Sequence, residues 1–536
     1  MQRLLSRRAL ATGLRGLTVP RAAAPRAVRG HPTVQVSRDF SWTVSRWVEE
    51  NEKKEEKEEE KKEEKEEEKK EEKEEREWST PLAKQLAKAI SMTGPVPLAS
   101  YMRMCLTGDI DGYYTGLAEE NRDQFGSKGD FITSPEISQI FGELIGIWFV
   151  TEWLSQGKPK RGVELIEVGP GRGTLMDDML RAIRNFKDLA QSIDAIYMVE
   201  ASPQLRETQK NLLCGPDAPM TESKVGYHSV CKHTNVPIVW TETVKSIPQN
   251  PEKMPFILAH EFFDALPIHV FQAVTVPPPL PKDPAPSTPV SNIPSPSQEP
   301  TVEWREMLVS PTPPNATHAS MNIPEYEQGH PIPDFQMTLS SGPTRHSRYL
   351  PDTSSRYRRL KAPNAVVEIC PDASLYAVDF ASRIGGSMQY PKPRPSGAAL
   401  ILDYGTSEDV PINSLRGIRR HRRVSPFSKP GLVDLSADVD FTAIAEEAIR
   451  ASKGIEVHGP VQQGAFLYQM GIKQRAEVLA SRLRENHKFR ESDAINEACD
   501  RLIDRGHGGM GKVYKAMAIL PENSGLRRPV GFGGDI

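Results

Sequence analysis

Short apolar runs alternate with helix-like stretches across the middle of this 536-residue chain. The run that begins at Val163 is followed by Leu175, Met179, Leu180 and Ile183, whose i, i+3/i+4 spacing predicts a helix. Strands that alternate with helices predict an α/β fold with a mainly parallel sheet. The further strand-like runs occupy residues 194–199, 256–259, 365–369 and 398–403.

Helical patterns flank these runs on both sides. Residues 81–106 and 136–155 predict an N-terminal helical subdomain over residues 80–160, and residues 466–505 predict one or two helices late in a core that spans 161–536. Two polar segments interrupt the core and predict mobile insertions. They are the Pro- and Ser-rich stretch near 277–300 and the Arg- and Ser-rich stretch near 341–363.

The N-terminus has a composition unlike the rest of the chain. Residues 1–38 contain eight arginines and no acidic residue, interspersed with leucines. This basic, acid-free pattern is typical of a mitochondrial transit peptide, and it predicts localisation in the mitochondrial matrix. The alternative is a disordered basic arm that binds nucleic acid.

Residues 39–79 form a low-complexity segment that cannot build a core. Between residues 49 and 77 there are 18 glutamates against 10 lysines or arginines, which predicts a solvated helix or disorder. The chain as a whole carries a formal charge of only −3. A nearly neutral body does not favour a nucleic-acid partner, and no apolar segment reaches the roughly 18 residues that span a membrane.

The five cysteines are scattered without C-x-x-C spacing. This pattern predicts free thiols in a reducing compartment, with no structural zinc and no metal site.

Three glycines at alternating positions, Gly169, Gly171 and Gly173, follow the first strand. Glycine allows a tight turn and a close approach of the backbone to a ligand. Glu200 ends the next strand and could accept hydrogen bonds from both ribose hydroxyls of a nucleoside. A dinucleotide loop needs G-x-G-x-x-G, but here the third glycine comes one residue early, and Glu167 would repel a pyrophosphate. The spacing therefore favours S-adenosyl-L-methionine, a cation without phosphates, over the cofactor of an NAD-linked oxidoreductase.

Further motifs outside the glycine loop lie at 94–95, 112–114, 129–143, 260–268, 367–372, 402–405, 435–441 and 459–472. These motifs resemble those of the MidA family of class I methyltransferases, in order, over about residues 90–475. The resemblance implies a Rossmann-like fold with C-terminal additions. Mitochondrial members of that family act as complex I assembly factors. The resemblance therefore also implies a substrate, an arginine in a core subunit of complex I, and a product, the symmetrically dimethylated side chain. A homodimer remains open.

Arginine methylation needs a carboxylate, because the guanidinium pKa exceeds about 12 and the neutral nucleophile is scarce. Glu261 and Asp264 are the candidate catalytic residues, since they follow the apolar strand at 256–259, where class I methyltransferases place their substrate-facing motif. Phe262 and Phe263 could wall the methyl channel or stack on the guanidinium, and His260 could position the substrate. The alternatives are a helix cap for Asp264, core packing for the phenylalanines and a structural hydrogen bond for His260.

The N-terminal motif could close over the donor as a lid. Asp130, Thr133, Ser134 and Glu136 lie in it, and Ser134-Pro135-Glu136 also resembles a capped helix start. A second function class also remains open. The protein could be a non-catalytic complex I assembly chaperone that retains a methyltransferase fold for binding.

Overall fold

The computed structural model describes residues 76–116, 124–126, 129–278, 300–321, 329 and 331–533. The chain divides into two units, residues 1–76 and 77–536, and every element described below belongs to the second. The predicted transit peptide, almost all of the Glu/Lys-rich segment and most of the loop near 277–300 lie outside the described residues. In the part of the chain that is described, no helix combines the length and apolarity needed to cross a bilayer.

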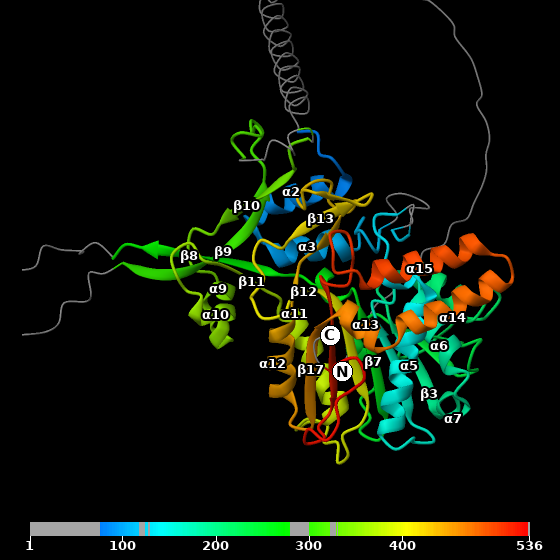
Figure 1. Ribbon diagram of the computed structural model, residues 1–536. Helices are drawn as coiled ribbons and strands as arrows, with labels where there is room; N and C mark the ends of the chain where they lie inside the picture. Colours follow the sequence, from blue (N-terminus) through cyan, green and yellow to red (C-terminus); the bar gives the residue numbers. More distant parts are fainter. Residues whose placement is uncertain are drawn as a thin grey trace, which may run out of the picture. The chain divides into compact units, whose positions relative to one another are not determined.

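A ten-stranded sheet forms the centre of the second unit (Figure 1). Its middle strands β12, β7, β2, β3 and β6 are parallel, and β2 and β7 are buried along their whole length. Continuous apolar strands of this kind are expected where helices cover both faces of a parallel sheet. In sheet order the strands are β17 (Ile455–Gln462), β18 (Tyr514–Pro521), β12 (Ala398–Thr406), β7 (Met254–His260), β2 (Val163–Val168), β3 (Ile193–Val199), β6 (Pro237–Thr241), β5 (Tyr227–Val230) and β4 (Thr221–Glu222), with β16 (Val439–Asp440) beside β12.

Helices cover both faces of this sheet and bury two separate cores. Leu165 of β2 packs on the face covered by α5 and α6, whereas the next residue, Ile166, packs on the face covered by α11 and α12. The predicted α/β architecture is therefore correct. The helices are α4 (Ser134–Ile137), α5 (Gln139–Ser155), α6 (Thr174–Ile183), α7 (Lys187–Ser192), α8 (Pro203–Leu213), α11 (Pro371–Gly385), α12 (Phe441–Ala451), α13 (Gln463–Gln469), α14 (Ile472–Glu485) and α15 (Phe489–Ile503), with the short 3-10 helices η1 (Val244–Ser246) and η2 (Phe263–Ala265).

A second layer lies beyond the carboxyl ends of the parallel strands (Figure 1). Helices α2 and α3 pack there on strands from distant parts of the chain and share one apolar core. The helix α2 begins at the Thr80 cap, whose side chain accepts a hydrogen bond from the Ala83 amide, and it ends at Gly94. The elements are α2 (Pro81–Thr93), β1 (Val96–Pro97), α3 (Leu98–Thr107), β8 (His269–Val276), β9 (Thr301–Pro311), β10 (Phe335–Leu339), β11 (Val366–Ile369), β13 (Arg416–Arg419), β14 (Arg422–Val424) and β15 (Asp434–Ser436).

Three sequence-based predictions differ from this arrangement. The strand at 365–369 is β11, which pairs antiparallel with β8 and does not join the parallel sheet. Together with β1, β9 and β10, these two strands form a five-stranded sheet in the second layer, which we call the second sheet. The helix at 136–155 packs on α6 over the central sheet, so residues 80–160 do not form one subdomain. Residues 341–363, predicted to be a mobile insertion, form α9 (Arg345–Tyr349), η4 (Leu350–Asp352) and α10 (Ser355–Arg359). Leu350 and Tyr357 of this segment are buried in an apolar cluster, which fixes it on the second sheet.

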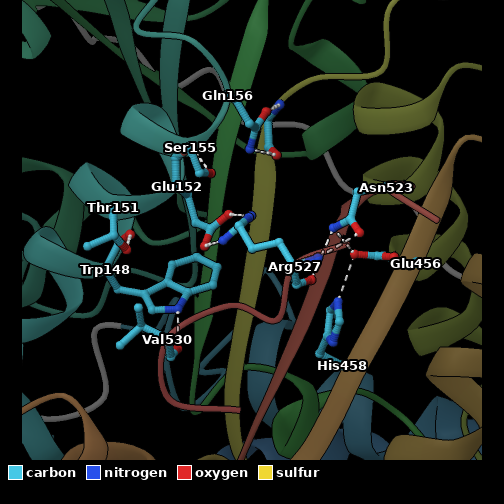
Figure 2. Close-up of polar contacts among 11 residues, drawn as sticks. Trp148, Thr151, Glu152, Ser155, Gln156, Glu456, His458, Asn523, Arg527 and Val530 are labelled. Carbon is cyan, nitrogen blue, oxygen red and sulfur yellow. Dashed lines mark hydrogen bonds and ion pairs between the residues drawn. The ribbon is translucent and has the colours of Figure 1, made fainter. Parts of the chain in front are cut away.

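The C-terminal segment after β18 is attached to α5, a helix that packs on the central sheet, by an ion pair whose carboxylate is buried (Figure 2). Arg527 donates to both carboxylate oxygens of Glu152 on α5, at 2.9 and 2.6 Å. The Glu152 side chain is fully buried, so this bidentate pair provides the neutralisation that a buried carboxylate requires. On the same helix, the Trp148 indole N–H donates to the Val530 carbonyl at 3.0 Å.

Candidate active site

The candidate site lies at the carboxyl ends of three adjacent parallel strands. Val168 at the end of β2 is in register with Ala259 of β7 on one side and with Val199 of β3 on the other. The residues that follow these three strands therefore meet at one level, where ligands of open α/β sheets bind. They surround a cavity of about 290 Å³, which we call the donor cavity.

The turn between β2 and α6 presents backbone to the donor cavity. Gly169, Gly171 and Gly173 all have φ between +52° and +83°, a region that glycine adopts without strain. A Cβ at Gly169 would lie 2.6 Å from Phe262 Cδ2, and a Cβ at Gly171 would lie 3.4 Å from the Phe125 ring. Larger residues at these positions would therefore narrow the cavity.

Two buried carboxylates line the donor cavity beside this loop. Glu200 is 7% exposed and accepts hydrogen bonds from the Ser202 amide at 2.8 Å and from Gln209 Nε2 at 3.1 Å. Glu167 is 2% exposed, and its Oε2 atom has no hydrogen-bond partner. Burial and the charge of Glu200 raise the pKa of Glu167 to about 8, and burial raises the pKa of Glu200 to about 7. An unpaired buried carboxylate fits a cationic ligand.

Gln209 on α8 connects these parts of the site, and the sequence analysis missed it. Its Nε2 atom donates to the Gly171 carbonyl at 2.6 Å as well as to Glu200, while its Oε1 atom accepts from the Trp240 indole at 2.9 Å. The only sequence signal is a polar residue on the buried face of the helix that follows Glu200.

Glu261 leaves the end of β7 in an unusual backbone conformation. Its φ is +48°, a region that costs free energy for any residue other than glycine and that is often found at functional sites. Its amide donates to the Leu402 carbonyl of β12 at 2.9 Å, which fixes the turn. Its Oε1 atom is buried, lacks a hydrogen-bond partner and lies 3.5 Å from His260 Nε2. Burial and the charges of Asp264 and Asp403 raise the pKa of Glu261 well above its usual range.

Asp403 of β12 holds the loop that carries the predicted residues. Its Oδ2 atom accepts from the amides of Phe262, Phe263 and Asp264 at 3.1, 2.9 and 3.4 Å. Its Oδ1 atom accepts from the Tyr404 amide at 2.8 Å. The sequence analysis included this acid in a family motif but assigned it no role.

The other predicted residues occupy different environments. His260 and Phe262 line the donor cavity, and burial lowers the pKa of His260 to about 3, so its ring is neutral. Phe263 is only 3% exposed and packs in the core, so the structure does not support a substrate contact for it. Asp264 does not line the donor cavity but lines a second one, which it shares with Glu261.

Part of the N-terminal motif lines the donor cavity. Thr133 and Glu136 form the capping box of α4 and also line the cavity. Glu136 lies 3.1 Å from Arg172 of the glycine loop, and Arg172 also donates to the Phe125 carbonyl at 2.8 Å. This segment is therefore a capped helix start that also lines the donor cavity, and the ion pair between Glu136 and Arg172 links it to the glycine loop.

Comparisons with known proteins agree with this geometry. The family model described as "Putative S-adenosyl-L-methionine-dependent methyltransferase" matches residues 144–461. The chain is 34% identical over 446 residues to "Protein arginine methyltransferase NDUFAF7, mitochondrial" of Xenopus laevis, which covers 82% of this chain and 85% of that protein. The Homo sapiens protein of the same name is 33% identical over 447 residues, with coverage of 82% and 84%.

A solved structure supports the fold. A Burkholderia thailandensis protein crystallised with bound S-adenosyl-homocysteine has a TM-score of 0.56 at 21% identity, covering 84% of this chain and 93% of that one. The family match and the resemblance inferred from the motifs agree, and S-adenosyl-L-methionine is the cofactor. The residues of the donor cavity fit it, because a positive sulfonium suits the unpaired Glu167 carboxylate and the glycine loop leaves space for a nucleoside. The chain thus belongs to the family of S-adenosyl-L-methionine-dependent methyltransferases.

Proposed function

We propose that this protein is a protein-arginine N-methyltransferase of the mitochondrial matrix. Its substrate is an arginine of a core subunit of complex I, which it dimethylates symmetrically and which complex I needs for its assembly or stability. The observation that carries the proposal is Glu261, a buried carboxylate at the wall of the donor cavity whose Oε1 atom has no hydrogen-bond partner.

Arginine is the substrate that most needs such a carboxylate. At pH 7–8 the neutral guanidine lies roughly 5 pKa units away, which corresponds to about 7 kcal/mol. A carboxylate that accepts the proton as the methyl group arrives lowers this barrier. Glu261 is suited to the task because the loop amides bound by Asp403 hold it in place. A bound guanidinium would also return the raised pKa of Glu261 toward its usual range.

The remaining residues of the donor cavity hold the cofactor. The S-adenosyl-L-methionine molecule supplies an electrophilic methyl group and leaves as a neutral thioether. Glu200 would accept hydrogen bonds from the ribose hydroxyls, the backbone at Gly169, Gly171 and Gly173 would lie against the nucleoside, and Glu167 would offset the positive sulfonium. His260, whose pKa burial lowers to about 3, is too weak a base to take the proton in place of Glu261.

The names of the relatives support both the substrate class and the location. The Xenopus laevis and Homo sapiens proteins are named as mitochondrial protein arginine methyltransferases. The first 38 residues of this chain, basic and without an acidic residue, agree with import into mitochondria. A scaffold that only binds complex I would not need Glu167, Glu200 and Glu261 around one cavity.

The test is mass spectrometry of complex I core subunits from cells that lack this protein and are complemented with variants. We expect the wild type to restore symmetric dimethylarginine on one subunit, and Glu261→Gln and Gly171→Val not to restore it. Glu222→Gln, an exposed site on β4, serves as the matched control. Titration calorimetry should show that Glu261→Gln keeps its donor affinity while Gly171→Val loses it.

Three outcomes would decide against the proposal. Normal complex I assembly in the Gly171→Val strain, with arginine methylation still present, would exclude this protein as the enzyme. Normal assembly with methylation absent would show that the modification is not needed. Full assembly by a Glu261→Gln protein that cannot methylate would favour the alternative function, an assembly chaperone.

A further inference from the structure

A second cavity, of about 460 Å³, adjoins the donor cavity. Three residues line both cavities, namely Tyr114, Phe131 and Glu261. A single layer of side chains therefore separates the two, and the candidate base lies in that layer. A group in the second cavity would approach the donor past the Glu261 carboxylate.

The second cavity lies between the central sheet and the three-stranded sheet formed by β14, β13 and β15. Asp264 of η2, Tyr404 of β12 and Tyr514 of β18 line it from the central sheet. Arg416 of β13 and Asp434 of β15 line it from the other side. Apart from η2, these elements are strands paired into sheets, which suits a site that must hold a reacting group in one position.

Unsatisfied carboxylates face this space. Asp264 is 7% exposed and Asp434 is 6% exposed. The Oδ1 atom of Asp264 and the Oε1 atom of Glu261 are buried without a hydrogen-bond partner. Burial raises the pKa of all three carboxylates, that of Asp434 to about 7. Asp434 accepts a hydrogen bond from the Tyr114 hydroxyl and Asp264 Oδ2 accepts one from the Tyr404 hydroxyl. The two oxygen atoms that remain without a partner fit a cationic hydrogen-bond donor.

The cavity wall already holds one guanidinium group. The Arg416 guanidinium lies 4.5 Å from the centre of the Tyr404 ring. Its ion pair is with Asp438 at 2.6 Å, and its charge only partly offsets the rise that burial causes in the pKa of Asp264. This contact demonstrates that the lining accepts a planar cation against an aromatic face.

We propose that the second cavity binds the guanidinium group of the substrate arginine, held by Asp264 and Asp434 with one nitrogen facing Glu261 and the donor cavity. This inference rests on the proposed function and adds the place where the substrate side chain lies. A guanidinium presents five N–H donors in a plane, so it can satisfy carboxylates on several sides at once and pack against tyrosine rings. A lysine ammonium is a compact charge that cannot match this arrangement.

Binding of a small probe tests the site independently of turnover. The probe is N-acetyl-arginine methylamide, titrated into the full-length protein saturated with S-adenosyl-L-homocysteine and followed by NMR. The matched probes are the lysine and the uncharged citrulline analogues. We expect the arginine probe to bind at least tenfold more tightly than either, and Asp434→Asn to weaken it at least tenfold with nucleoside affinity unchanged within twofold.

Two further variants guard against misfolding and surface effects. Asp217→Asn is exposed outside both cavities and should leave probe affinity unchanged. Val513→Trp places a large ring at the rim of the second cavity from a position that is 56% exposed, so it tests the same space without altering a buried group. We expect it to weaken the arginine probe while the nucleoside still binds.

The outcomes separate this inference from the proposed function. If Asp434→Asn and Val513→Trp both bind the arginine probe as the wild type does, or if the wild type does not prefer arginine, the second cavity is not the guanidinium site. If the arginine probe binds as expected but no complex I subunit is methylated, the site is supported and the proposed function fails. With the unmethylated target subunit as the substrate, we expect Asp434→Asn to raise KM and Glu261→Gln to lower kcat.

Discussion

Binding of the nucleoside at neutral pH should release protons from the donor cavity. With pKa values of about 7 for Glu200 and about 8 for Glu167, the Glu200 carboxyl group is partly protonated and the Glu167 carboxyl group is largely protonated at pH 7 in the free protein. Ribose hydroxyls donate hydrogen bonds to Glu200, and a sulfonium favours ionised Glu167, so bound ligand lowers both pKa values. The sign is fixed by linkage, because affinity rises with pH wherever binding releases protons.

The magnitude follows from the two pKa values. At pH 7 Glu200 is about half protonated and Glu167 about nine-tenths protonated, so their ionisation releases roughly 0.5 and 0.9 protons. S-adenosyl-L-homocysteine has the ribose but no sulfonium, and it should release about half a proton. S-adenosyl-L-methionine should release up to about 1.4 protons. Between pH 6 and pH 9, Glu200 alone should strengthen binding about tenfold.

The assay is titration calorimetry in two buffers that differ in ionisation enthalpy. The Glu200→Gln variant should lose the half proton released by S-adenosyl-L-homocysteine, whereas Glu222→Gln, on exposed β4, should keep it. Comparing variants with one ligand cancels the titration of the ligand's own amino group. Proton release below about 0.1 at pH 7, or equal release in Glu200→Gln, would refute the assigned role of Glu200.

Two other predictions concern stability and the glycine loop. Arg527→Ala should lower the free energy of unfolding by about 3 kcal/mol, because it leaves its fully buried carboxylate partner on α5 uncompensated. Arg528→Ala, exposed beside it, is the control in denaturant titration, and equal effects would contradict the ion-pair argument. Gly169→Ala should weaken donor binding more than tenfold, because its Cβ would lie 2.6 Å from a neighbouring ring. Gly157→Ala has a similar φ of +91° but open space around it, so it should bind the donor normally.

The sequence was most informative where the site is local. Gly169, Gly171 and Gly173 sit between a strand and the helix that follows, and a strand, a tight turn and a helix can be predicted from neighbouring residues alone. Glu200 and Glu261 were identified for the same reason, since each directly follows an apolar strand. Parallel strands then place all these residues at one edge of the sheet.

The sequence was least informative where distant segments meet. The strand β11 has the same apolar pattern as the strands of the parallel sheet, but it pairs with β8. The apolar pattern of a strand does not determine which other strand it will pair with. Residues 341–363 contain few apolar side chains, yet Leu350 and Tyr357 suffice to hold them on the second sheet. In both cases the structure of the segment depends on the strands against which it packs, and these come from distant parts of the chain.

By itself, the sequence determined the fold class, the donor loop and the carboxylates that follow the strands, because these depend on the periodicity and order of adjacent residues. Only the tertiary structure decided that Asp403 holds the Glu261 loop from about 140 residues away. It also decided that Asp264 faces a different cavity from the donor. Which groups form hydrogen bonds with each other, and which side chains line the same cavity, is decided when separate strands pack together. No single segment of the sequence contains that information.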